Sequence, residues 1–229
     1  MGIILIASLA PVLILMIYIY NKDKFQKEPL PTLLKALLGG VLAGALDVLI
    51  LSVLHPEQWF SFTQPVHKAL FQAFGLAAIP EEFCKLVFLY LFIWKSPSFD
   101  EYYDGPEYAA FVGLGFAGLE NIMYVMQGGL GVAVSRALFA VPAHFFFAIF
   151  MGYFFAHAKF KPAQKHFYLF LALLIPVILH GIYDFVLMYA ELIQDLNTGT
   201  ASILNIGFFV FFIFVWKMAV RRVENMVGR

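Results

Sequence analysis

Long apolar stretches separated by short polar segments run through the whole chain. An α-helix rises about 1.5 Å per residue, so about 20 apolar residues cross a hydrocarbon core of about 30 Å. The pattern predicts about seven membrane-spanning helices, at residues 2–20, 31–54, 69–94, 107–127, 131–157, 167–190 and 200–217. We therefore predict an all-α fold, that of a polytopic helical membrane protein.

The composition indicates that lipid is the solvent for much of this chain. Of its 229 residues, 62% are hydrophobic and only 13% are charged, whereas a soluble domain is about 25% charged and under about 50% apolar. One globular core cannot hide so much apolar surface, so we expect the bilayer to cover the rest. The net charge of zero argues against a nucleic-acid partner. Because no internal repeat divides the chain, we expect residues 1–229 to form one integral-membrane domain.

The positions of Lys and Arg predict how the helices are oriented. The opposite ends of the predicted spans differ sharply, because one side carries only Lys68 and Arg136. The other side carries Lys22, Lys24, Lys27, Lys35, Lys95, Lys159, Lys161, Lys165, Lys217, Arg221, Arg222 and Arg229. Basic residues concentrate on the cytoplasmic side of membrane proteins, so we predict an outside N-terminus and a cytoplasmic C-terminus. No basic residue precedes the first apolar run, which favours a membrane span over a cleaved signal peptide.

Ionisable residues interrupt several predicted spans at a similar depth. Such a group costs about 2.5–3.5 kcal/mol at the centre of a membrane helix, so it is a functional hypothesis by default. Four of them each lie 13 residues from the predicted cytoplasmic end of their span: Glu81, Glu120, His144 and His180. We therefore predict that these carboxylates and imidazoles meet at one level, about 20 Å from the cytoplasmic side.

Local spacing adds partners to this group. Lys85 follows Glu81 by four residues and Glu82 by three, so it can pair with either carboxylate along one helix face. Asp184 follows His180 by four residues and is placed to orient the imidazole ring.

Proline residues fall close to the same positions. Pro80 directly precedes Glu81, Pro142 lies two residues before His144, and Pro176 lies within the predicted sixth span. A proline is favoured in the first turn of a helix, where the helix dipole also favours a carboxylate. Pro80 is therefore expected to allow a helix to restart just before the paired glutamates.

Each of these residues also has an ordinary structural explanation. A lone membrane histidine is more often a hydrogen-bonded packing residue than a catalytic one. A structural ion pair with one protonated acid is an alternative explanation for Glu81, Glu82 and Lys85, and Glu120 is as well explained by a role in holding helices together. Asp47 follows a stripe of small residues, so close helix packing is its expected role. A coincidence of four structural sites in one plane is nevertheless less probable than one shared site.

In chain order, these residues resemble the PrsW family of intramembrane proteases. That family belongs to a glutamate-dependent superfamily with the CAAX prenyl endopeptidases and the bacteriocin-processing enzymes. The matching motifs are Glu81-Glu82-x-x-Lys85, Phe116-x-x-x-Glu120-Asn121, His144 and His180-x-x-x-Asp184, with the stretches FDEYYDGPEY (99–108) and GLGFAGLENIMY (113–124). Where the CAAX endopeptidases have FxxxH, this chain has FxxxE. That departure leaves the role of Glu120 open between a second acid of the site and its scaffold.

The resemblance implies a multi-pass endopeptidase of the bacterial cell (inner) membrane. Its expected partners are the lipid bilayer and a single-pass membrane protein substrate. In bacterial members of the family the suggested substrate is an anti-sigma factor, cut near the outer face to begin a stress response.

Peptide hydrolysis needs an activated water, a polarised carbonyl and a proton for the leaving amine. We hypothesise that Glu81 is the general base and that His144 shares the water or passes the proton. Glu82 would set the charge balance with its neighbouring lysine, and His180 would donate to the oxyanion. The supporting residues are Lys85, Glu120, Asn121 and Asp184.

Two other functions remain open at this point. A zinc-dependent protease would use Glu81, His144 and His180 as ligands, although the sequence has no HExxH motif; the resemblance favours a mechanism without metal or other cofactor. A proton- or ion-coupled transporter would also place acids and proline-broken helices in the bilayer, although no inverted repeat is detectable. A relative that binds helices without cutting them is a third possibility.

Overall fold

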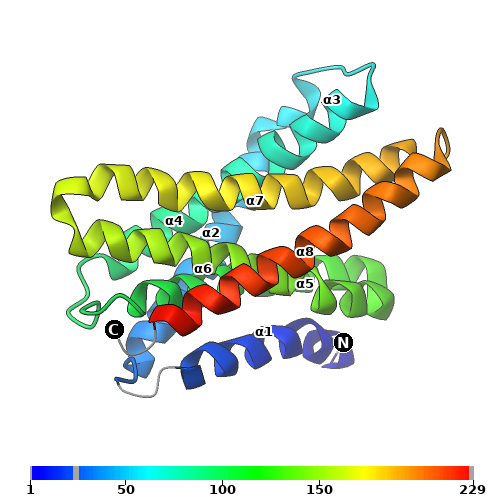
Figure 1. Cartoon of the computed structure of the whole chain (residues 1–229). Coiled ribbons are helices and arrows are strands. Elements are labelled where there is room, and N and C mark those ends of the chain that lie inside the picture. Colours follow the sequence, from blue (N-terminus) through cyan, green and yellow to red (C-terminus); the bar gives the residue numbers. More distant parts are fainter. Residues whose placement is uncertain (1, 23–25, 227–229) are drawn as a thin grey trace.

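The computed structural model describes residues 2–22 and 26–226, and within these ranges the chain forms helices and no strands. The long helices are α1 (Gly2–Lys22), α2 (Leu30–Leu54), α4 (Ile79–Ile93), α5 (Asp104–Leu138), α6 (Ala140–Phe160), α7 (Lys165–Ile193) and α8 (Thr198–Met226). The short ones are η1 (Pro56–Gln58), α3 (Pro65–Leu70), η2 (Phe71–Ala78) and η3 (Pro162–Gln164). Figure 1 shows the long helices packed as a bundle, with α1 beginning and α8 ending at opposite ends. The all-α prediction is confirmed.

Five helical runs are long and apolar enough, by length and composition, to cross a membrane. They are Gly2–Lys22, Leu30–Gln58, Asp104–Phe160, Pro162–Ile193 and Thr198–Met226. The chain is therefore a multi-pass membrane protein. The third run contains both α5 and α6. The count of seven spans and the orientation of the termini stay predictions, and Lys24 and Arg229, which entered the orientation argument, lie outside the described residues.

The centre of the bundle is formed by α5 and α6, whose facing sides carry residues without bulky side chains. A Cβ added to Gly113 of α5 would lie 2.6 Å from the Ala148 Cβ of α6. Near the start of α5, a Cβ on Gly105 would lie 2.4 Å from the carbonyl oxygen of Gly152. Helices packed this closely use small residues at the contact. This packing holds His144, which is buried on α6, directly beside α5.

Two irregular segments shape the helices around His144. Gly129 has a φ of +72°, a left-handed conformation that glycine adopts readily, and it kinks α5 near its end. Residues 128–130, which separate the predicted spans 107–127 and 131–157, thus form this kink. The helix then continues as far as Leu138. The break between α5 and α6 lies at Phe139, inside the fifth predicted span. The sequence pattern alone did not reveal this break.

The third predicted span, 69–94, is also irregular. The π-helix η2 precedes α4, and Pro80 stands in the first turn of α4. Glu81 and Glu82 therefore lie in the first turn of a new helix, as the position of the proline suggested.

Candidate active site

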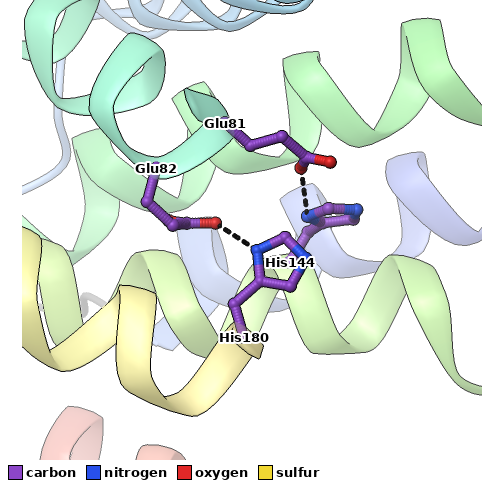
Figure 2. A group of neighbouring side chains, drawn as sticks. All are labelled: Glu81, Glu82, His144 and His180. Carbon is purple, nitrogen blue, oxygen red and sulfur yellow. Dashed lines mark hydrogen bonds and ion pairs between the residues drawn. The ribbon is translucent and has the colours of Figure 1, made fainter. Parts of the chain in front are cut away.

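Four ionisable side chains from three helices converge inside the bundle. Glu81 and Glu82 come from α4, His144 from α6 and His180 from α7 (Figure 2). All four are buried, and one ligand atom from each lies within 4.8 Å of the others. Residues up to 99 positions apart are thus brought together, whereas their common depth in the membrane stays a prediction.

Lys85 lies at the centre of this cluster and is 1% exposed. Its Nζ atom lies 2.7 Å from Glu82 Oε1, 3.2 Å from Glu81 Oε2 and 3.0 Å from His144 Nδ1. The ammonium also lies 4.1 Å from the centre of the Phe116 ring. A buried charge is tolerated when it is paired and hydrogen-bonded. Lys85 therefore compensates the two adjacent glutamates, as its sequence spacing predicted.

His180 lies between two carboxylates. Its Nδ1 atom lies 2.9 Å from Glu82 Oε1, and its Nε2 atom lies 3.2 Å from Asp184 Oδ2. The ring also stacks on Phe147, with ring centres 5.0 Å apart. The Asp184 contact was predicted from the four-residue spacing, whereas the Glu82 contact joins residues on different helices and was missed.

Glu120 of α5 lies against His144. The Nε2 atom of His144 is 2.9 Å from Glu120 Oε2. Because the Lys85 ammonium can only donate, Nδ1 of His144 accepts and Nε2 carries the proton that is donated to Glu120. The acid of the FxxxE motif therefore orients the imidazole ring and fixes its tautomer.

Arg136 also belongs to this group, and the sequence analysis missed it. Its Nη2 atom donates to Glu120 Oε2 at 2.6 Å, and its Nε atom donates to Asn121 Oδ1 at 2.8 Å. The Asn121 side chain donates in turn to the carbonyl oxygen of Ser8 on α1, at 2.7 Å. The sequence signal for this contact is Gly128-Gly129, which lies midway between Glu120 and Arg136 and lets the chain fold back.

Two cavities open beside the cluster. The first, which we name the α8-side cavity, has a volume of about 440 Å³ and is lined by Glu81, Glu120, Arg136, His144, His180 and Asp184, with apolar residues of α6, α7 and α8. The second, the α2-side cavity, has a volume of about 420 Å³ and is lined by Glu81 and Glu120 together with residues of α2 and η2. Glu82, Lys85 and Asn121 line neither of these two cavities. They lie behind the groups that face open space.

The cluster has the donor groups of a metal site. Two carboxylates and two imidazoles are ligands that zinc takes in proteins, and the Oε2 atom of Glu82 is buried without a hydrogen-bond partner. Glu81, Glu82, His144 and His180 therefore fit a divalent metal ion by residue type and by proximity. The Lys85 ammonium now contacts three of these four residues, so a metal ion and the ammonium would compete for the same atoms.

A second group of buried acids lies away from this site, where α2 and α5 begin. Glu28, in the segment before α2, is 3% exposed and accepts a hydrogen bond from the Tyr108 hydroxyl. Burial, and then the neighbouring acids Asp104, Glu107 and Asp100, raise the pKa of Glu28 to about 9. At neutral pH this carboxyl group is therefore protonated in the folded protein.

Comparison with known proteins gives consistent matches. Residues 28–218 match the family described as PrsW family intramembrane metalloprotease. The chain is 35% identical over 224 residues to Protease PrsW of Geobacillus kaustophilus (strain HTA426), covering 97% of this chain and 91% of that protein. It is 33% identical over 227 residues to Protease PrsW of Clostridioides difficile (strain 630), covering 96% and 90%. With Protease PrsW of Bacillus subtilis (strain 168) the identity is 34% over 185 residues, covering 80% and 82%. No solved structure matches the chain.

Proposed function

The chain belongs to the PrsW family of intramembrane proteases and is a membrane peptidase, and we propose that Glu81 activates the water with which it hydrolyses a peptide bond. One observation carries this proposal: Glu81 lines both cavities and lies beside both histidines. A carboxylate that faces open space next to imidazole groups is placed to act as a general base.

The three clustered glutamates differ in how much of each is committed to other groups. Glu82 is fully buried and contacts Lys85 and His180 behind the cavities. Glu120 is held by Arg136 and His144. Glu81 uses Oε2 for Lys85, and its side chain reaches the space where a substrate can enter. Glu81 is therefore the best-placed base, and Glu82 is a positioning residue for His180.

His144 is placed to share the water with Glu81. Its Nδ1 atom lies 4.0 Å from Glu81 Oε2 and now accepts from the Lys85 ammonium, so a water molecule that contacts both groups has to take the place of the ammonium at this nitrogen. Its other nitrogen is engaged by Glu120, which keeps the ring in one orientation. The imidazole can then take a proton from the water side or return one to the leaving amine.

His180 is placed to stabilise the oxyanion. Its two ring nitrogens face carboxylates of Glu82 and Asp184, and an imidazole can donate to both at once only as the imidazolium cation. The nitrogen near Asp184 lies on the side of the α8-side cavity, which Asp184 also lines. To stabilise an oxyanion in that cavity, the N–H at this nitrogen has to be shared between Asp184 and the substrate, and a donor held in place at developing negative charge contributes strongly to acyl-transfer catalysis.

The residues of the proposed catalytic site are also suited to hold a divalent metal ion. A divalent ion held by Glu81, His144 and His180, with Glu82 as a further ligand, would supply Lewis-acid polarisation of the scissile carbonyl. The roles proposed for the side chains do not require that ion, since base, proton carrier and oxyanion donor are all present in the chain. Cleavage that survives a chelator supports the metal-free form; loss with EDTA and recovery with zinc supports the metal-dependent one.

We propose as the substrate class a single-pass membrane protein such as an anti-sigma factor, cut near the outer face of the bacterial inner membrane. Membership in the family supports a membrane protein as substrate. The common depth of the ionisable residues along their spans supports a cut inside the bilayer and toward the predicted outer side.

The test is cleavage by purified protein in detergent. The wild type is incubated with single-pass membrane proteins, and new termini are mapped by mass spectrometry. We expect Glu81→Gln to lower the rate by at least about 100-fold. The matched control is Glu57→Gln, an exposed glutamate outside the site, which should cut as fast as the wild type. Ion flux in proteoliposomes, without cleavage, would favour a transporter instead.

A further inference from the structure

The two cavities meet at the proposed general base. Five residues line both of them: Ala77, Glu81, Glu120, Tyr124 and Met188. Glu81 and Glu120 thus lie between the two cavities. The catalytic group lies between two open spaces and not at the end of one.

The outer walls of the two cavities come from different helices. On one side, α8 contributes Asn205, Phe208 and Phe209. On the other side, α2 contributes Asp47 and Val48. Val48 and Asn205 are themselves exposed at the surface of the protein, so each cavity reaches the outside of the bundle.

An endopeptidase has to hold chain on both sides of the bond that it cuts. A helix has a diameter of about 10–12 Å and keeps its carbonyl groups in internal hydrogen bonds, so a transmembrane substrate has to unwind before water can attack. Each cavity exceeds 400 Å³, more than ten times the roughly 30 Å³ share of one water molecule in the liquid. Both cavities are large enough for side chains of a peptide.

Polar side chains are present in both cavities besides the clustered acids and histidines. The α8-side cavity has Ser135 and Asn205, and the α2-side cavity has Gln72 and Gln127. An unwound segment in an apolar setting needs partners for its freed N–H and C=O groups. Amide and hydroxyl side chains can supply them by both donating and accepting.

We propose that the two cavities form one substrate groove that binds an extended, unwound segment of the membrane protein across Glu81. Residues before the scissile bond occupy one cavity, and residues after it occupy the other. The α2 and α8 walls therefore determine specificity on opposite sides of the cut. This inference rests on the proposed protease function and adds the conformation and placement of the substrate.

Crosslinking to a trapped substrate tests the groove. Cys84 is the single cysteine in the sequence, so Cys84→Ala with Glu81→Gln provides an inactive background without thiols. Val48→Cys and Asn205→Cys are then introduced one at a time. The probe is a single-pass membrane protein with one cysteine moved through its span, linked with a short bismaleimide.

We expect Val48→Cys to link to probe positions on one side of the cut and Asn205→Cys to link to positions on the other side. The matched controls are Leu49→Cys and Ile206→Cys, which are exposed neighbours on the same helices and line neither cavity. They should give less than a tenth of the crosslinked product. Links from both cysteines to the same stretch, or equal links from the controls, would overturn the groove.

The groove and the protease function fail in different ways. If the wild type leaves the probe uncut while the two cysteines link to two separate stretches, the proposed substrate class is wrong and the groove is supported. If the wild type cuts the probe but the two cysteines do not crosslink to positions on opposite sides of the cleavage site, the protease function is supported and the proposed groove is wrong.

A second measurement uses active protein. Val48→Trp and Asn205→Trp narrow the two cavities in turn. Each should lower kcat/KM at least tenfold for substrates with a large residue on one side of the cut, and the side should differ between the two variants. An equal loss for every substrate with Val48→Trp would instead make the α2-side cavity a route for water and overturn its role in the groove.

Discussion

Acidic side chains are buried in two regions of this protein, and each region accommodates them differently. In the active-site cluster, Lys85 and Arg136 lie within hydrogen-bonding distance of Glu81, Glu82 and Glu120. Near the start of α2, Glu28 lies among other acids and bonds to the Tyr108 hydroxyl. The first region compensates charge with cations, and the second keeps Glu28 protonated. A carboxylate that must accept a proton needs the first arrangement, whereas a packing residue can use the second.

Removal of the Lys85 ammonium, which compensates the buried glutamates of the active site, should have the largest effect on stability and activity. Lys85→Met leaves Glu82 buried without its ammonium partner, and breaking a buried ion pair in this way costs about 3–5 kcal/mol. We expect a large loss of thermal stability and of protease activity. Unfolding followed in detergent, with cleavage assayed in parallel, measures both effects.

The double variant Glu82→Gln/Lys85→Met sharpens the same comparison. It removes the charge of Glu82 together with that of Lys85, so part of the lost stability should return, although Glu81 stays without its ammonium partner. Activity should stay low, because His180 has lost the carboxylate at its Nδ1 atom. A double variant as unstable as Lys85→Met would show that charge compensation is not what Lys85 contributes.

Arg136 should have a smaller effect, through Glu120 and His144. Arg136→Lys keeps the positive charge but loses the geometry that lets one side chain bond to both Glu120 and Asn121. We expect kcat to fall about tenfold with a smaller change in KM, because the imidazole is less well oriented. Equal kcat for Arg136→Lys and the wild type would remove Arg136 from the site.

The sequence predicted the convergence of the site better than its internal contacts. Counting residues along each span sets the depth of a side chain, and it placed Glu81, Glu120, His144 and His180 together. The contacts of Arg136 with Glu120 and of Glu82 with His180 depend on how the helices rotate and fold back. That rotation is set by close packing, such as that of Gly113 against Ala148, which hydrophobic patterning does not encode.

The smallest effect is expected in the second acidic region. The pKa of Glu28 is about 9 in the folded protein against an ordinary value of 4.5, so its contribution is fully present below about pH 4.5 and is lost as pH rises toward 9. Glu28→Gln mimics the protonated acid. It should raise the melting temperature by a few degrees at pH 8.5 and change it little at pH 5, as thermal unfolding at the two pH values will show. A variant that is equally stabilised at both pH values would contradict the protonated state.

Labelling with heavy-oxygen water tests the central claim most directly. Purified wild type cuts a single-pass membrane protein in H₂¹⁸O, and mass spectrometry reads the new carboxyl terminus. If Glu81 activates water for peptide hydrolysis, the wild-type product carries one ¹⁸O atom and Glu81→Gln forms almost no labelled product. Labelled product formed by Glu81→Gln at the wild-type rate would contradict that role.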